Sequence, residues 1–172
     1  MRDAAEKAES RRAVLAELNR LGIYYEMTEH EAAYTVEDMD RVGFDKKILI
    51  CKNLFVRDQR KKPRHWLVVL PKDKRADLGA LADQLDAKHL SFASEDRLMR
   101  YLGLGQGEVT PLGVFNDESR SVTVVFDRDL IDREWLGVHP NDNTATLALS
   151  FGNILKFLSE QGNPVKYVTL RD

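Results

Sequence analysis

Cysteine and long apolar runs are scarce in this sequence, and each scarcity excludes a class of protein. The 172 residues contain one cysteine, Cys51, so neither an internal disulfide framework nor a cysteine-rich zinc site can form. This usage suits a reducing compartment, and we expect a cytoplasmic protein. No stretch approaches the roughly 20 apolar residues of a membrane span, and the N-terminus lacks the apolar core of a secretion signal. We therefore expect no membrane association.

An excess of positive charge is also missing. Lysine and arginine number 26 against 28 aspartates and glutamates, which gives a formal net charge of −2. Proteins that coat DNA carry a global basic field, so we expect no DNA partner, and any polyanion must meet a local patch. The balance of 43% hydrophobic and 31% charged residues is typical of a folded soluble protein. The length suits one domain spanning residues 1–172.

Motifs for metals, cofactors and protein nucleophiles are absent as well. The four histidines, at positions 30, 65, 89 and 139, have no metal-ligand spacing. The stretch GLGQG at 103–107 is not a dinucleotide fingerprint, because its third glycine comes one residue early and a predicted helix precedes it. No phosphate-binding loop and no Gly-x-Ser-x-Gly elbow occur. We expect no metal, no cofactor and no serine-hydrolase chemistry.

Apolar periodicity and capping residues predict short helices scattered among short strands. Thr35 and Ser94 are predicted N-caps, and glycines 22, 43 and 162 are positioned to end helices. The predicted helices cover residues 4–21, 36–43, 77–86, 94–103 and 151–162, and the predicted strands cover 23–30, 47–58, 65–71, 90–94, 121–127, 144–150 and 166–170. This order favours an α+β domain whose mixed, largely antiparallel curved sheet or partly closed barrel is surrounded by helices.

Lys52 occupies an unusual position in the predicted strand ILICKNLFV. Side chains alternate between the two faces of a strand, so Lys52 shares its face with four aliphatic residues at positions 48, 50, 54 and 56. Removing an ammonium group from water is costly unless a partner compensates it. Two explanations remain open at this point: a structural role, by snorkelling or ion pairing, and an anion-binding or polarising role.

Two loops could supply further polar groups. Glycine can bring its backbone close to a ligand, so Gly107, with Pro111 stiffening the exit, could direct backbone N–H groups at an oxygen. His139 precedes a proline and is followed by Asn141 and two more short polar residues that could orient a polar ligand. An ordinary loop and a surface histidine are the alternative interpretations.

A basic run, RDQRKKPRH, lies at the predicted hairpin turn. Such a turn could contact the phosphates of a nucleic acid, although charged residues also populate solvated turns. Its candidate contacts are Arg57, Arg60, Lys61, Lys62 and Arg64.

Several segments together resemble a known family. In order and at roughly the same separations, EHEAAYTVED, KNLFVRD, WLVVLP, LSFASEDRL, GEVTPLGVFND, VVFDRDL and HPNDNTATLALS are similar to the prolyl-tRNA synthetase associated domain, the YbaK-type family of aminoacyl-tRNA deacylases. The resemblance covers residues 24–166 and is strongest to the free-standing members that hydrolyse alanyl-tRNA(Pro). It implies an editing enzyme whose partner is aminoacylated tRNA(Pro), with a possible transient contact to prolyl-tRNA synthetase.

The resemblance also implies roles for individual residues. Lys52 with Asn53 matches the lysine that the family needs for activity, and Gly107 with Pro111 matches its Gly-x-x-x-Pro loop. His139 matches the histidine that helps delimit the family's amino-acid pocket, and Asp127 matches an acidic position near that histidine.

These matches suggest a mechanism without a protein nucleophile. Lys52 would anchor the terminal phosphate or ribose, the Gly107 N–H would polarise the carbonyl, and a water oriented by the substrate's free ribose hydroxyl would attack. Two alternatives stay open: a deacylase of the same fold for another substrate such as cysteinyl-tRNA(Pro), and a noncatalytic tRNA-binding module.

Overall fold

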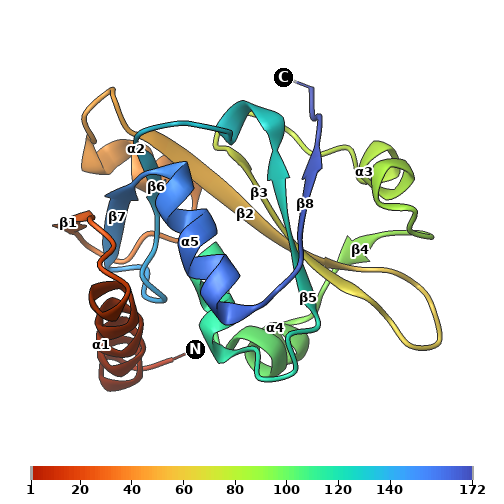
Figure 1. Ribbon diagram of the computed structural model, residues 1–172, viewed down its shortest axis with the longest axis horizontal. Helices are drawn as coiled ribbons and strands as arrows, with labels where there is room; N and C mark the ends of the chain where they lie inside the picture. Colours follow the sequence, from red (N-terminus) through yellow and green to blue (C-terminus); the bar gives the residue numbers. More distant parts are fainter. Residues whose placement is uncertain (1, 172) are drawn as a thin grey trace.

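A long strand, β2 (Leu49–Arg57), crosses the centre of the structure and pairs with other strands along both of its edges (Figure 1). The computed structural model describes residues 2–171. The strands follow the order β1, β7, β6, β2, β3, β5, β8, and the short β4 also pairs with β2. The other strands are β1 (Glu26–Glu29), β3 (His65–Pro71), β4 (Ser91–Phe92), β5 (Val122–Asp127), β6 (Leu136–Val138), β7 (Ala145–Leu149) and β8 (Val165–Val168).

The mixed, mostly antiparallel pairing confirms the predicted fold class. β2 pairs antiparallel with β3 and β4, and β7 pairs antiparallel with β1 and β6. The β2–β6, β3–β5 and β5–β8 pairs are parallel. The hairpin of β2 and β3 was predicted correctly. Of the two predicted forms, a curved sheet and a partly closed barrel, the protein has the sheet, which is not closed because β1 and β8 form the two ends of the strand order.

Within residues 2–171 the α-helices begin and end at residues that cap them. Thr35 and Asp38 form a capping box at the start of α2, and the Ser94 side chain accepts the Arg97 N–H at the start of α4. The helices are α1 (Ala4–Arg20), α2 (Val36–Val42), α3 (Leu78–Leu85), α4 (Glu95–Leu102) and α5 (Phe151–Gln161). No helix in this part of the chain is long and apolar enough to cross a bilayer.

Alternation along β3 divides the apolar core between two faces of the sheet. Leu67 and Val69 pack into the larger cluster with α1, α4 and α5, and Figure 1 shows α5 lying across this sheet. Trp66, Val68 and Leu70 point the other way and pack with α3. Successive side chains of a strand face opposite sides, so the continuous apolar run of β3 is covered on both.

Three short elements were not predicted from the sequence. β6 has three residues, which are too few to show a periodic pattern. The 3₁₀ helices η1 (Pro111–Asn116) and η2 (Arg128–Leu130) are likewise short. η1 begins at Pro111, in a segment that we expected to be a loop, and the Thr110 hydroxyl accepts the Leu112 N–H at 3.3 Å at its start.

Candidate active site

The edge of β2 that faces away from β3 is interrupted by a gap. At one end of this edge β6 pairs with Leu49 and Ile50, and at the other end β4 pairs with Val56 and Arg57. Between these two partners, none of the described residues forms a strand beside positions 51–55. A gap inside a sheet leaves backbone polar groups available to a ligand.

The backbone groups of Cys51 and Asn53 point into this gap. In the antiparallel pair with β3, the even-numbered residues of β2 exchange the hydrogen bonds, so the odd-numbered residues direct their N–H and C=O groups to the other edge. The Phe55 C=O illustrates this direction, because it accepts the Ala93 N–H of the β4 segment at 2.9 Å. The gap therefore presents donors and acceptors at fixed positions.

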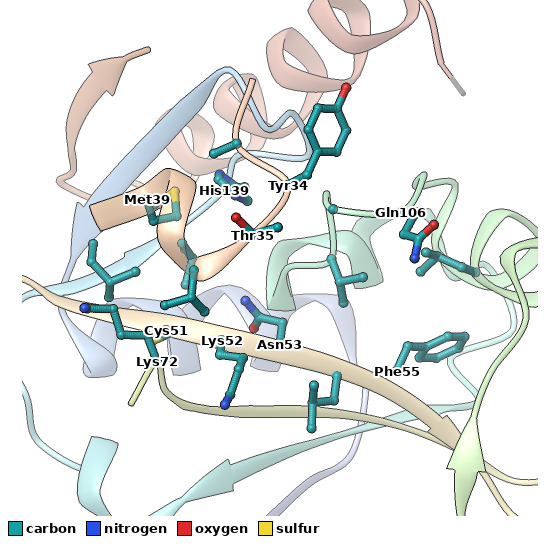
Figure 2. A pocket seen from close by; sticks show the side chains of 18 of the residues that line it. Tyr34, Thr35, Met39, Cys51, Lys52, Asn53, Phe55, Lys72, Gln106 and His139 are labelled. Carbon is teal, nitrogen blue, oxygen red and sulfur yellow. The ribbon is translucent and has the colours of Figure 1, made fainter. Parts of the chain in front are cut away.

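A cavity of about 340 Å³ lies at the gap. Its walls come from β2, from the start of α2, from the loop before η1, from the segment that follows β4 and from the end of β6 (Figure 2). Four of the residues singled out from the sequence line it: Lys52, Asn53, Gly107 and His139.

Asn53 presents its amide to the cavity. Figure 2 shows its side chain on the side of β2 that faces Thr35 and His139. The Oδ1 atom is buried and has no hydrogen-bond partner among the described residues. Leaving a buried acceptor unpaired costs about 1–3 kcal/mol, so this oxygen is a candidate acceptor for a hydrogen bond from a ligand.

Lys52 also lines the cavity, but its ammonium group is held on the other side of β2. Figure 2 shows the Lys52 and Asn53 side chains leaving opposite faces of the strand. The Lys52 ammonium donates to the backbone carbonyl of Lys74, in the loop between β3 and α3. Burial and the charge of Arg75 lower the pKa of Lys52, and Asp73 partly opposes this shift. The ammonium thus has a protein partner.

Asp127 is not among the residues that line the cavity. Its carboxylate, in a residue that is 1% exposed, lies 2.8 Å from the Lys74 ammonium, which also lies 2.7 Å from the Asp129 carboxylate. Lys74 donates as well to the Leu170 carbonyl at 2.9 Å. Asp127 therefore fixes the loop whose carbonyl holds Lys52, whereas the expected position beside His139 in the pocket is not found.

Gly107 needs to be a glycine for two reasons. Its φ is +83°, in the left-handed region, and a β-carbon built on it would stand 2.6 Å from Cδ1 of Tyr34. Pro111 and Asn141 are buried and lie outside the cavity lining. The Asn141 amide donates to the Leu112 carbonyl at 3.4 Å, so these two predicted substrate-binding residues support the loops around the cavity.

The ring of His139 has a defined tautomer. Its Nδ1 lies 2.8 Å from the Ala145 carbonyl, which can only accept, so Nδ1 carries the proton and Nε2 remains an acceptor. Burial lowers the pKa of His139, which favours the neutral ring. The Thr110 hydroxyl donates to the His139 carbonyl at 2.7 Å and connects this residue to the segment that follows Gly107.

The side chains around the cavity include one thiol, that of Cys51. Burial raises the pKa of Cys51 to about 12, so the thiol stays protonated at neutral pH and is a poor nucleophile. Within residues 2–171, no three His, Cys, Asp or Glu side chains gather as metal ligands do.

The basic residues of the β2–β3 turn are of two kinds. The Asp58 side chain is fully buried, and it pairs with Arg64 at 2.9 Å and with Arg60 at 3.5 Å. Arg57 donates to the Asp58 carbonyl at 3.2 Å. The two exposed lysines of this turn, Lys61 and Lys62, have no ion pair among the described residues. These two are free to meet a phosphate.

Several residues of the cavity wall were not identified from the sequence. Tyr34 covers Gly107, and Met39, Phe92 and Gln106 complete other parts of the wall. Thr35 was predicted only as a helix cap, a role that it has. Because exposed aromatic and amide side chains are common on protein surfaces, these residues gave no signal of their own.

Comparison with known proteins links this geometry to one family. Residues 30–157 match the model of the aminoacyl-tRNA editing domain. The chain is 44% identical over 162 residues to the prolyl-tRNA editing protein ProX of Acetoanaerobium sticklandii, covering 94% of this chain and 98% of that protein. It is 39% identical over 151 residues to prolyl-tRNA synthetase associated domain-containing protein 1 of Danio rerio, covering 86% and 81%.

The fold is also similar to solved structures. A crystal structure provisionally described as a trans-editing enzyme for prolyl-tRNA synthetase superposes with a TM-score of 0.73 at 18% identity, covering 95% of this chain and 97% of that chain.

Proposed function

The chain belongs to the aminoacyl-tRNA editing domain family, and on that premise we propose that it is a free-standing deacylase that removes alanine from mischarged tRNA(Pro). The observation that carries the proposal is the cavity at the gap in the sheet. It combines an unpaired strand edge, the unpaired Asn53 Oδ1 and the Gly107 backbone in one enclosure. An aminoacyl ester offers a matching set of groups, namely an ammonium donor, a carbonyl acceptor and ribose hydroxyls.

Asn53 and the backbone carbonyls of the gap are suited to the ammonium end of the substrate. The α-ammonium of an aminoacyl ester has three N–H donors, and the buried Asn53 Oδ1 is an acceptor without a partner. A hydrogen bond to a charged group is worth about 1.5–3 kcal/mol. This contact would fix the scissile carbonyl relative to β2.

We assign Gly107 to the ester carbonyl of the substrate and Lys52 to its terminal nucleotide. The backbone at Gly107 would stabilise the negative charge that develops on the carbonyl oxygen, as preorganised N–H groups do in acyl transfer. The Lys52 ammonium would leave the Lys74 carbonyl and bind the terminal phosphate or ribose. Exchange of a neutral carbonyl for an anionic oxygen strengthens its hydrogen bond, which favours this movement.

Water is the nucleophile in this scheme. Its oxygen attacks the ester carbonyl, the bond between the acyl carbon and the ribose oxygen breaks, and alanine leaves a free ribose hydroxyl on the tRNA. The protonated Cys51 thiol cannot replace it. The free ribose hydroxyl next to the ester is placed to orient the attacking water, which fits a cavity whose residues supply positioning and charge stabilisation.

We propose that the size of the cavity determines which esterified amino acid is accepted. A volume of about 340 Å³ must hold both the aminoacyl group and the terminal ribose, so a larger side chain competes with the sugar for space. One methylene in an apolar pocket is worth only about 1–3 kcal/mol, and exclusion by the wall provides the stronger discrimination. Ile50 and Val138 are two of the aliphatic residues of this wall.

Hydrolysis of three charged forms of tRNA(Pro), measured side by side, tests the proposal. The purified chain is incubated with tRNA(Pro) carrying alanine, cysteine or proline, and release above the enzyme-free rate is recorded. We expect alanine to be released with the highest kcat/KM and proline to be spared. Faster release of cysteine than of alanine would support cysteinyl-tRNA(Pro) as the substrate. Binding of all three charged tRNAs without hydrolysis would support a noncatalytic tRNA-binding module.

A further inference from the structure

Arg2 makes a buried ion pair with Glu108, the residue that follows Gly107. The contact between guanidinium and carboxylate is bidentate: Nε donates to Oε1 at 3.0 Å and Nη2 donates to Oε2 at 2.8 Å. The side chains are only 6% and 2% exposed. A planar guanidinium that bonds both carboxylate oxygens fixes the orientation of its partner as well as its distance.

The same guanidinium bridges two loops of the candidate active site. Its NH2 group also donates to the backbone carbonyl of Asn141 at 2.6 Å, two residues after His139. Glu108 Oε1 accepts the Gly105 N–H at 2.9 Å, which closes the loop that carries Gly107. The Arg2 guanidinium, which precedes α1, therefore connects the loop that contains Gly107 to the loop that begins at His139.

Two further contacts of α1 are directed at the same region. The Lys7 ammonium donates to Asn143 Oδ1 at 2.8 Å, and Arg11 pairs with Asp142 at 2.9 Å. Neither contact reaches the Gly107 loop, so Arg2 is the α1-side cation that joins the two loops. Arg2 and Glu108 are absent from the cavity lining.

Stability alone is a weak reason for such a pair. Taking two charges out of water offsets much of their attraction, and apolar replacements of buried ion pairs are often neutral. What the pair does supply is a fixed relative position of two loops, and a displacement of about 1 Å in a catalytic site can reduce a rate by about a hundredfold.

We propose that Arg2 is a positioning residue for the deacylation reaction: through Glu108 and the Asn141 carbonyl, and together with the Thr110–His139 hydrogen bond, it sets the distance between the Gly107 backbone and His139. This inference rests on the proposed function for its kinetic part and on the geometry alone for its structural part.

Comparison of Arg2→Met with Val14→Ala tests the proposal. Val14 is fully buried in α1, so its truncation loosens the same helix without touching the ion pair. Single-turnover deacylation of alanyl-tRNA(Pro) is measured well below the Tm of both variants. We expect Arg2→Met to lower the rate at saturating enzyme about tenfold to a hundredfold, Val14→Ala to stay within about twofold of the wild type, and Arg2→Lys to be intermediate.

Hydrogen exchange read by mass spectrometry supplies a measurement that does not depend on activity. In Arg2→Met, exchange should rise in residues 103–110 and 139–144 together, whereas Val14→Ala should leave both segments protected. Unchanged exchange in these loops, or equal kinetic losses in the two variants, would overturn the proposal. A wild-type chain without deacylase activity would instead contradict the proposed function, and the exchange result would still decide the positioning role.

Discussion

Gly107 packs directly against Tyr34, so closely that a β-carbon on Gly107 would stand 2.6 Å from Cδ1 of the ring. Both residues line the cavity. Tyr34 comes from the segment before α2 and Gly107 from the loop before η1, and their contact closes one side of the site.

Gly107→Ala should therefore damage both folding and catalysis. The left-handed backbone costs a residue with a β-carbon about 1–2 kcal/mol, and displacement of Tyr34 adds to this. Gly22→Ala is the matched control, because Gly22 has a φ of +69° and a β-carbon added there would meet nothing within 4 Å. We expect Gly22→Ala to lose about 1 kcal/mol and keep full activity, while Gly107→Ala loses more stability and at least about tenfold in kcat/KM. Urea unfolding measures the stability of both variants, and deacylation rates measure their activity. Equal losses of stability and activity in the two variants would contradict the role of Gly107.

Asn53→Ala should separate stability from activity. Removal of an unpaired buried oxygen recovers a desolvation cost of about 1–3 kcal/mol, which offsets the lost packing, so the free energy of unfolding should change by no more than about 1 kcal/mol. Loss of a hydrogen bond to the substrate ammonium should lower kcat/KM by about tenfold to a hundredfold. A variant that is much less stable and fully active would mean that Asn53 is a structural residue.

The two exposed lysines of the β2–β3 turn should affect only tRNA binding. In Lys61→Gln/Lys62→Gln, the slope of log Kd against log salt should fall by about one for each phosphate contact removed, with an unchanged Tm. Arg64→Gln is the contrasting variant, because it leaves the buried Asp58 without its 2.9 Å partner and should lower the Tm. If filter-binding titrations give the double variant the wild-type salt slope, the turn does not contact the tRNA.

His65 should make the protein less stable in mild acid. Burial and the charge of Arg97 lower the pKa of His65 from 6.5 to about 4, and its Nε2 lies 3.1 Å from the Arg97 guanidinium. Between these pH values the unfolded chain binds a proton that the native protein does not, so the free energy of unfolding falls as the pH is lowered from about 6.5 toward 4, by up to about 3 kcal/mol. His65→Gln, which keeps an acceptor for Arg97, should show a flatter dependence in urea titrations. The same slope in both proteins would assign the effect to other groups.

Much of the fold could be predicted because its signals are local. The Thr35 cap, the Ser94 cap and the alternation of β2 and β3 depend on neighbouring residues, and each appears as expected. The gap in the sheet depends instead on which strands pair with β2 and where they stop. That information is carried by contacts between distant segments, including the three-residue β6, and no periodicity records it.

The candidate site was predictable in part for the same reason. Lys52, Asn53, Gly107 and His139, which were singled out from the sequence, line one cavity. The direction of a side chain was harder to foresee: the Lys52 ammonium bonds to the Lys74 carbonyl, and Asp127 supports Lys74. Both contacts involve the β3–α3 loop, whose position against β2 follows from tertiary packing.

The most direct test of the whole account is the single-turnover hydrolysis of alanyl-tRNA(Pro) by the wild type and by Lys52→Met, with tRNA binding measured on the same samples. We predict that the wild type releases alanine well above the spontaneous rate, and that Lys52→Met binds the tRNA within about tenfold of the wild-type Kd while its hydrolysis rate falls by at least about a hundredfold. Hydrolysis by Lys52→Met at the wild-type rate, or a wild type that binds the charged tRNA and never releases alanine, would contradict it.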